Sequence, residues 1–200
     1  MKRGQTRRDR LYALAETQGG YFTAADAKAL GFVYPHQFFH VKRGNWVRVG
    51  RGLFRLKHFP AAAHEDLIRW WLWSRKQGVI SHESAAAVYD LGDVLPSKTH
   101  LTVPPGFRKK GPGSVILHRA QLEATDVETR EGFRITTPLR TILDLAREHL
   151  DPERLRAVTR DALKKGLIDR KALLSYLGKM PEEIDLASQV TLQLAVGEAR

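Results

Sequence analysis

The sequence contains no cysteine, and it contains only two methionines among 200 residues. Disulfide bonds, thiolate zinc sites and cysteine nucleophiles are therefore excluded for these residues. No apolar run approaches the roughly 18 residues that a membrane-spanning helix needs. The opening residues, MKRGQTRRDR, also lack the apolar segment of a secretory signal. We therefore expect a cytoplasmic protein with no membrane partner.

The usual patterns of nucleotide-binding and catalytic proteins are also missing. Neither G-x-x-x-x-G-K-[ST] nor G-x-G-x-x-G occurs, so no glycine loop is predicted to hold phosphate groups. The carboxylates of residues 61–200 are scattered beside basic residues, without the compact D…E-x-K pattern of metal-dependent nucleases. We therefore predict no enzyme activity, no catalytic residue and no cofactor.

Acidic residues are scarce in the first sixty positions, where 12 Lys and Arg against three Asp and Glu give a net charge of +9. The remaining positions hold 21 Lys and Arg against 19 Asp and Glu, so most of the total charge of +11 lies at the amino-terminal end. A basic surface concentrates polyanions and binds them with an affinity that falls as salt rises. Because no long amphipathic basic helix accompanies this charge, nucleic acid is favoured over a membrane surface.

With 42% hydrophobic and 28% charged residues, the chain has the composition of a globular protein. In the first sixty residues, apolar spacing and helix-capping residues predict three helices and then two strands joined by Gly50-Arg51-Gly52. The expected elements are helices 8–17, 24–30 and 35–43, and strands 46–49 and 53–56. This order is typical of a winged helix-turn-helix domain, in which the third helix enters the major groove of DNA and the hairpin contacts the backbone.

The third helix is predicted to have an apolar face and a polar face. Tyr34, Phe38 and Val41 share one side, which we expect to pack against the first two helices. His36, His40 and Arg43 share the opposite side, flanked by Gln37 and Phe39. The polar side is predicted to contact DNA.

The hairpin is also predicted to have an apolar face and a polar face. Side chains alternate along a strand, so Val47 and Val49 should face the core. Arg48 should then remain in solvent, and Arg51 should lie at the tip. Both arginines are candidates for phosphate contacts.

Histidine and serine patterns raise two alternatives that we weigh and set aside. His36 and His40 have the i, i+4 spacing of zinc ligands, but no glutamate lies between them and no third ligand is evident, so we predict no metal site. Ser81 to Ser84 read Ser-His-Glu-Ser, but successive residues in a first helical turn point in different directions and cannot form a catalytic triad. Helix capping by Ser81 is the preferred interpretation.

Residues 61–200 are predicted to form a second, mixed domain. A helix over 64–77 carries Trp70, Trp71 and Trp73 beside Leu and Ile, which indicates core packing rather than stacking on bases. Further strands and helices follow, with Thr137-Pro138 and Asp151-Pro152 as helix starts. The expected elements are strands 99–103, 114–118 and 132–136, and helices 138–148, 152–165, 170–177 and 186–196. The predicted fold class is α+β, with domains 1–60 and 61–200.

Four segments of the sequence resemble AbiEi-type antitoxins. Two of them, GGYFTAADAKALGF and VKRGNWVRVGRGLFRL, resemble the winged helix domain of that family. The other two, ISHESAAAVYDLGDVLPSKTHLTVP and ITTPLRTILDLA, resemble its second domain. The resemblance covers roughly residues 5 to 180.

The resemblance implies the antitoxin of a type IV toxin-antitoxin system in bacterial abortive infection. Such an antitoxin represses its own operon by binding inverted repeats in double-stranded DNA. It counters a nucleotidyltransferase-like toxin without necessarily forming a stable complex with it, and this action needs the second domain. The DNA-contacting residues implied are His36, Gln37, His40, Lys42, Arg43, Arg48 and Arg51.

Two alternatives remain open at this point. One is a stand-alone transcriptional regulator without a toxin. The other is a protein-interaction module that neutralises a partner directly, with its basic end contacting RNA or an acidic protein surface.

Overall fold

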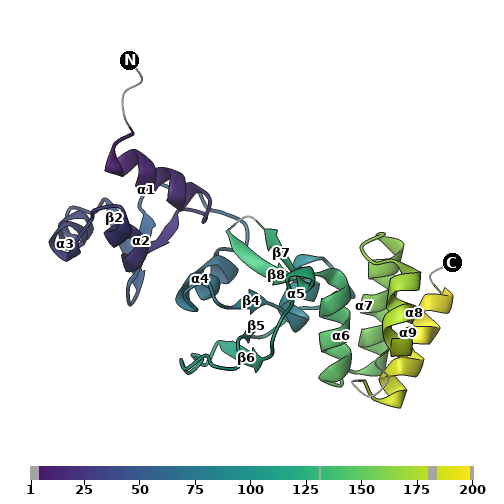
Figure 1. The fold of residues 1–200 in the computed structure, drawn as a ribbon. Helices are drawn as coiled ribbons and strands as arrows, with labels where there is room; N and C mark the ends of the chain where they lie inside the picture. The colour runs from purple at the N-terminus through teal and green to yellow at the C-terminus, as the bar shows by residue number, and fades with distance from the viewer. Residues whose placement is uncertain (1–4, 131, 180–183, 199–200) are drawn as a thin grey trace. The chain divides into compact units, whose positions relative to one another are not determined.

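A computed structural model describes residues 5–130, 132–179 and 184–198. The chain divides into two compact units, each described separately below. One is built from the chain up to Gln77 together with Thr129–Phe133, and the other from Gly78–Glu128 and the chain from Arg134 onward. Helices and sheets are both present, which confirms the α+β class (Figure 1). No helix within the described ranges is both long and apolar enough to cross a membrane.

The amino-terminal unit has the topology of a winged helix-turn-helix. Its strands form an antiparallel sheet in the order β1-β3-β2. The short strand β1, which the sequence did not predict, pairs Phe22 with Phe54 and so connects the hairpin to the helices. The elements are α1 (Arg7–Glu16), β1 (Tyr21–Thr23), α2 (Ala24–Ala29), α3 (Tyr34–Lys42), β2 (Trp46–Gly50), β3 (Leu53–Leu56) and α4 (Glu65–Trp73).

Aromatic side chains form the centre of this unit. Trp46 lies against Phe22 at 4.8 Å and Phe32 at 5.3 Å between ring centroids, both edge to face. Such aromatic pairs stabilise a core beyond their buried area. At the start of α2, the hydroxyl of Thr23 and the carboxylate of Asp26 form a capping box.

Helix α4 belongs to the amino-terminal unit. Tyr21 donates its hydroxyl proton to Glu65 at 2.9 Å, and Arg55 bonds to the same carboxylate at 3.0 Å. Lys76 forms an ion pair with Asp26 at 3.1 Å. These contacts explain why the first unit extends to Gln77, whereas the sequence predicts a boundary after residue 60.

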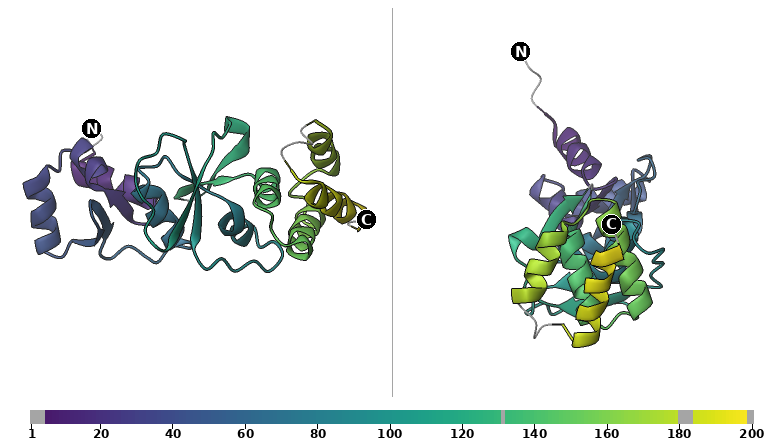
Figure 2. Two further views of the ribbon diagram at one scale, coloured as in Figure 1. Left: turned by 90° about the horizontal axis from the view of Figure 1, so that it is seen from below. Right: turned by 90° about the vertical axis from the view of Figure 1, so that its right-hand side faces the viewer.

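The carboxyl-terminal unit contains a five-stranded mixed sheet in the order β6-β5-β4-β8-β7. Strand β4 runs antiparallel to β5 and parallel to β8, and β5 runs parallel to β6. Helices α6 to α9 lie side by side (Figure 2). The elements are β4 (Val79–Ile80), α5 (His82–Val88), β5 (Thr99–Val103), β6 (Val115–Arg119), η1 (Ala124–Asp126), β7 (Val127–Arg130), β8 (Phe133–Thr136), α6 (Pro138–Arg147), α7 (Pro152–Lys164), α8 (Arg170–Lys179) and α9 (Leu186–Glu198).

The predicted helix starts at Thr137 and Asp151 are confirmed. Thr137 accepts a hydrogen bond from the backbone N–H of Arg140, and Asp151 accepts from those of Glu153 and Arg154. Proline follows each cap as the first helical residue. Near α7, Gly92 has a φ of +61°, and a Cβ there would lie 2.7 Å from Val158. Only glycine permits this close approach.

Candidate nucleic-acid interface

Helix α3 faces the core with a different side from the one we predicted. Tyr34 is 78% exposed and Phe38 is 59% exposed, so the expectation that they pack against α1 and α2 is wrong. Gln37 and His40 are instead buried, each with 7% exposure. The face of α3 that packs against the core is therefore the one that carries Gln37 and His40. Burying these two polar side chains is tolerated because each has specific partners that offset its desolvation.

Gln37 is held by the backbone of α2 and the turn that follows it. Its amide nitrogen donates to the carbonyl oxygen of Phe32 at 2.7 Å and to that of Ala24 at 3.1 Å. Ala24 is the first residue of α2, and Phe32 lies in the segment between α2 and α3, so one side chain bonds to both. Gln37 therefore fixes the turn of the helix-turn-helix rather than pointing outward.

His40 is part of the aromatic core. Its ring stacks on Trp46 at 4.6 Å with an interplanar angle of 16°, and its Nδ1 lies 3.1 Å from Nδ2 of Asn45. Burial, and then the charges of Arg8 and Arg7, lower the pKa of His40. A neutral imidazole thus fills the space that an apolar side chain would otherwise take.

We expect Gln37→Ala to lower the free energy of unfolding by about 1–3 kcal/mol, because two carbonyl groups lose their buried donor. Chemical denaturation followed by circular dichroism measures this change. His36→Ala, at an exposed position one residue away, is the matched control and should leave stability within about 0.5 kcal/mol of the wild type. Equal effects of the two substitutions would contradict the buried role of Gln37.

The exposed side of α3 is both basic and aromatic. His36, Lys42 and Arg43 are exposed, and the guanidinium of Arg43 lies 5.4 Å from the ring centre of Phe39. Phe39 itself is 50% exposed. Lys42 and Arg43 lie at the carboxyl end of the helix, where positive charge also interacts favourably with the helix dipole.

The β2–β3 hairpin presents the two arginines that we predicted to stay in solvent. Arg48 and Arg51 are both exposed, and the register shifts between Arg48 and Gly50 as in a β-bulge. The expectation for Val47 is wrong, because this side chain is 43% exposed. Trp46 takes the core position instead, since its large ring fills the space beside the helices.

Three further exposed arginines, which the sequence did not single out as DNA contacts, lie on α1. They are Arg7, Arg8 and Arg10. The guanidinium of Arg7 lies 4.9 Å from the ring centre of Phe32 and donates to the carbonyl of Gly31 at 3.3 Å. Arg8 lines a groove of about 360 Å³ whose wall includes His40 and Trp46. The sequence R-R-D-R marks these arginines as a basic cluster, but charge alone does not show which face of α1 is exposed.

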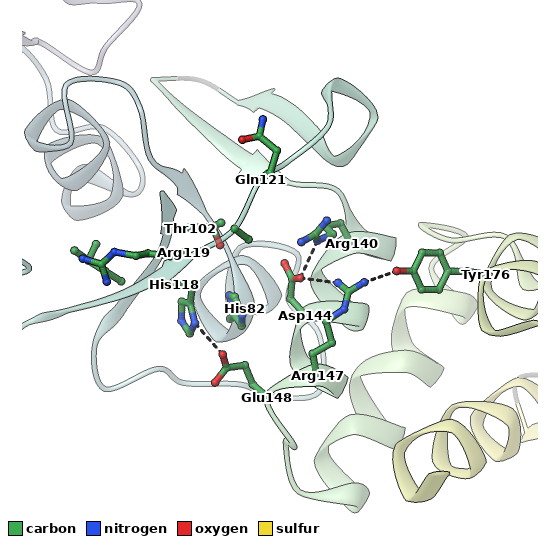
Figure 3. Close-up of a pocket in the computed structure, with 12 residues that line it drawn as sticks. His82, Thr102, His118, Arg119, Gln121, Arg140, Asp144, Arg147, Glu148 and Tyr176 are labelled. Carbon is green, nitrogen blue, oxygen red and sulfur yellow. Dashed lines mark hydrogen bonds and ion pairs between the residues drawn. The ribbon is translucent and has the colours of Figure 1, made fainter. Parts of the chain in front are cut away.

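The carboxyl-terminal unit has a polar pocket of about 670 Å³ (Figure 3). On one side, the carboxylate of Asp144 accepts hydrogen bonds from Arg140 at 2.7 Å and Arg147 at 3.1 Å, and Arg147 also bonds to Tyr176. The other oxygen of Asp144 is buried without a hydrogen-bond partner. Burial raises the pKa of Asp144, although the two arginines oppose this shift.

The opposite side of the pocket carries His82 and His118. Ser81 is the N-cap residue of α5 as predicted, but its hydroxyl does not cap the helix. It lies 2.9 Å from Nδ1 of His82 and accepts a hydrogen bond from Thr102 at 2.8 Å. Because Ser81 has no exposed surface, its hydroxyl does not face a substrate.

The neutral state of His82 should make stability depend on pH. Burial, followed by the charges of His118, His100, Arg140 and Arg147, lowers the pKa of His82 to about 2. The unfolded chain therefore takes up a proton below pH 6.5 that the folded chain does not, so stability falls as pH falls from 6.5. We expect this residue to contribute roughly 1 kcal/mol per pH unit in that range.

Denaturant unfolding of the wild type and His82→Asn at pH 7.5, 6.5, 5.5 and 5.0, in buffer with a chelator, measures this contribution. Asparagine tolerates the left-handed backbone found at this position, where φ is +51°. The slope of stability against pH should be smaller in the variant. Parallel pH profiles would contradict the buried, neutral state of His82.

Taken together, these features define an α+β protein with a winged helix-turn-helix topology in one unit and a mixed five-stranded sheet in the other. No protein-family model and no curated protein matches the sequence. Among solved structures, the chain is similar to the crystal structure of the RV2827C protein from Mycobacterium tuberculosis, with a TM-score of 0.56. The match covers 95% of this chain and 76% of that chain at 16% identity, so the likeness concerns the fold alone.

Proposed function

We propose that this protein is a DNA-binding transcriptional repressor that acts as an antitoxin of the AbiEi type. The observation that carries the proposal is the basic surface formed by the end of α3 and the hairpin of a winged helix topology. Lys42, Arg43, Arg48 and Arg51 are all exposed there. In winged helix-turn-helix domains, the third helix enters the major groove and the hairpin contacts the backbone.

Each of these side chains suits a particular contact. Arg43 can form two parallel hydrogen bonds with the edge of a guanine, which is the most frequent specific contact in the major groove. Arg51 at the hairpin tip and Lys42 suit phosphate oxygens, which position the protein on the duplex without reading its sequence. Gln37 and His40 are left out of this proposal, because their side chains are buried.

Binding to the DNA upstream of its own reading frame tests the repressor function. We expect the full-length protein to bind this duplex at least about 1,000-fold more tightly than a shuffled duplex of the same composition at equal salt. Inverted repeats in the protected region would indicate two copies bound about a symmetric site. Equal affinity for both duplexes would overturn the proposal of specific repression.

The antitoxin function requires a separate test. A nucleotidyltransferase-like reading frame next to this one, toxic when expressed alone and harmless when expressed with this protein, would support it. Loss of that rescue on deletion of the carboxyl-terminal unit, with the remaining chain still expressed, would assign the effect to that unit. If no such reading frame lies next to this one and the protein still binds its DNA specifically, the result would instead support a stand-alone regulator.

The exposed aromatic side chains of α3 favour a second candidate, direct binding of a protein partner. Tyr34, Phe38 and Phe39 are each at least half exposed, and aromatic residues are enriched where proteins bind each other. The double substitution Tyr34→Ala and Phe38→Ala separates the two functions. A loss of toxin neutralisation with unchanged DNA affinity would favour the protein-binding function.

A further inference from the structure

Three histidines from three different elements meet in the carboxyl-terminal unit. His82 begins α5, His100 lies in β5 and His118 lies in β6, and one ring nitrogen of each is within 4.8 Å of those of the others. Nδ1 of His100 lies 3.1 Å from Nε2 of His118. That separation is close to the distance between two nitrogen ligands of one tetrahedral zinc ion, each about 2.0–2.1 Å from the metal.

The second nitrogen of each ring faces a separate polar group. Nδ1 of His82 lies 2.9 Å from the Ser81 hydroxyl, and Nδ1 of His118 lies 3.2 Å from the carboxylate of Glu148. Nε2 of His100 lies 3.9 Å from the carboxylate of Glu83. Histidines that bind metals are usually oriented in this way, with the remaining ring nitrogen bonded to a carboxylate or another oxygen.

The position of His82 also points to a functional constraint. Its backbone has a φ of +51°, which is uncommon for any residue with a side chain, and its side chain is buried with 5% exposure. Such strained residues are concentrated at binding and catalytic sites. Here the unusual conformation places the imidazole beside His118, at 3.5 Å between ring centroids.

We propose that His82, His100 and His118 form a binding site for a divalent transition metal, with zinc as the best match to three imidazole ligands. In the structure the rings of His82 and His118 are nearly parallel, at 14°. Since a metal lies close to the plane of each ligating ring, its binding requires these rings to turn toward a common point. His118 has room to turn, because its side chain is 13% exposed at the pocket wall.

Three protein ligands leave one position of a tetrahedral zinc ion open. His82 and His118 both line the polar pocket, so a water molecule or a ligand atom from the pocket would take this position (Figure 3). The three histidines belong to the carboxyl-terminal unit, whereas α3 and the hairpin belong to the amino-terminal unit, so this proposal does not rest on DNA binding. It also departs from our expectation that the protein binds no metal.

Titration of zinc chloride into the full-length protein after chelator treatment tests the proposal. Calorimetry should show one ion per chain with a dissociation constant in the micromolar range or below. Cobalt(II) should give the visible absorption bands of a four-coordinate ion. Zinc should also raise the midpoint of thermal unfolding, because it binds only the folded state.

Two ligand variants and one outer variant locate the ion. His100→Gln and His118→Gln should each weaken binding by more than the roughly 10–100-fold that loss of an outer partner costs, and Glu148→Gln should weaken it within that range. His149→Gln is the matched control, since this exposed histidine pairs with Asp185 outside the cluster.

Four results would overturn the proposal. They are no zinc binding to the folded wild type, equal binding by His118→Gln and the wild type, unchanged binding by Glu148→Gln, and loss of binding on substitution of His36 but not of His100. Circular dichroism establishes that each variant is folded. Should a ligand variant fail to fold, Glu148→Gln at its 59% exposed side chain still decides the question, because unchanged affinity in that variant would exclude the arrangement.

Discussion

Trp46→Ala is expected to lower the free energy of unfolding of the amino-terminal unit by about 3–5 kcal/mol, the largest loss of stability that we predict. Trp46 is 4% exposed and its ring contacts Phe22, Phe32, His40 and Phe54. Its removal takes away the ring that packs against both His40 of α3 and Phe54 of the hairpin. Urea denaturation followed by circular dichroism measures the loss.

The matched control is Phe38→Ala. Phe38 is predicted from the sequence to lie in the core, but its side chain is 59% exposed in the structure. We therefore expect a change within about 0.5 kcal/mol for this substitution, as at other surface positions. A loss of several kcal/mol from Phe38→Ala, with little from Trp46→Ala, would show that the face of α3 has been assigned incorrectly.

Substitution of the basic residues of α3 and the hairpin is expected to have the largest effect on DNA binding. Arg43→Ala should weaken binding to the specific site by about 1–3 kcal/mol and relax sequence preference at one base pair, because a guanine loses its bidentate partner. Arg48→Ala with Arg51→Ala should weaken binding to all sequences similarly. The slope of log affinity against log salt should fall by about 0.9 for each phosphate group that the variant no longer neutralises.

Removal of two lysines from the other unit controls for total charge. Lys164 and Lys171 are exposed, so Lys164→Ala with Lys171→Ala lowers the net charge by the same amount as the hairpin substitutions. Fluorescence anisotropy across a range of salt concentrations compares the variants. An unchanged salt slope for the hairpin variant, or an equal change in the lysine control, would contradict phosphate binding by the hairpin.

The order of elements in the amino-terminal unit could be predicted because capping residues and glycines mark their ends. The Thr23–Asp26 capping box and the hairpin at Gly50-Arg51-Gly52 are examples of such local signals. The core-facing side of α3 could not be predicted in the same way. Hydropathy places Phe38 inside and Gln37 outside, whereas the hydrogen bonds of Gln37 to the carbonyls of Ala24 and Phe32 reverse this arrangement.

Long-range contacts also explain what the sequence did not reveal in the rest of the chain. Strand β1 has only three residues and is defined by its pairing with β3. His82, His100 and His118 are far apart in the sequence, and they meet because β5 pairs with β6 and α5 follows β4 in the same sheet. No local motif marks such a cluster, because the three histidines come together only in the folded chain.

Hydrogen exchange of the full-length protein, with and without the duplex from upstream of its reading frame, tests most directly whether α3 and the hairpin bind DNA. We expect the duplex to slow amide exchange in 34–43 and 46–56, and a shuffled duplex at the same salt to produce much weaker protection. Protection confined to 78–198, or equal protection by both duplexes, would contradict DNA recognition by α3 and the hairpin.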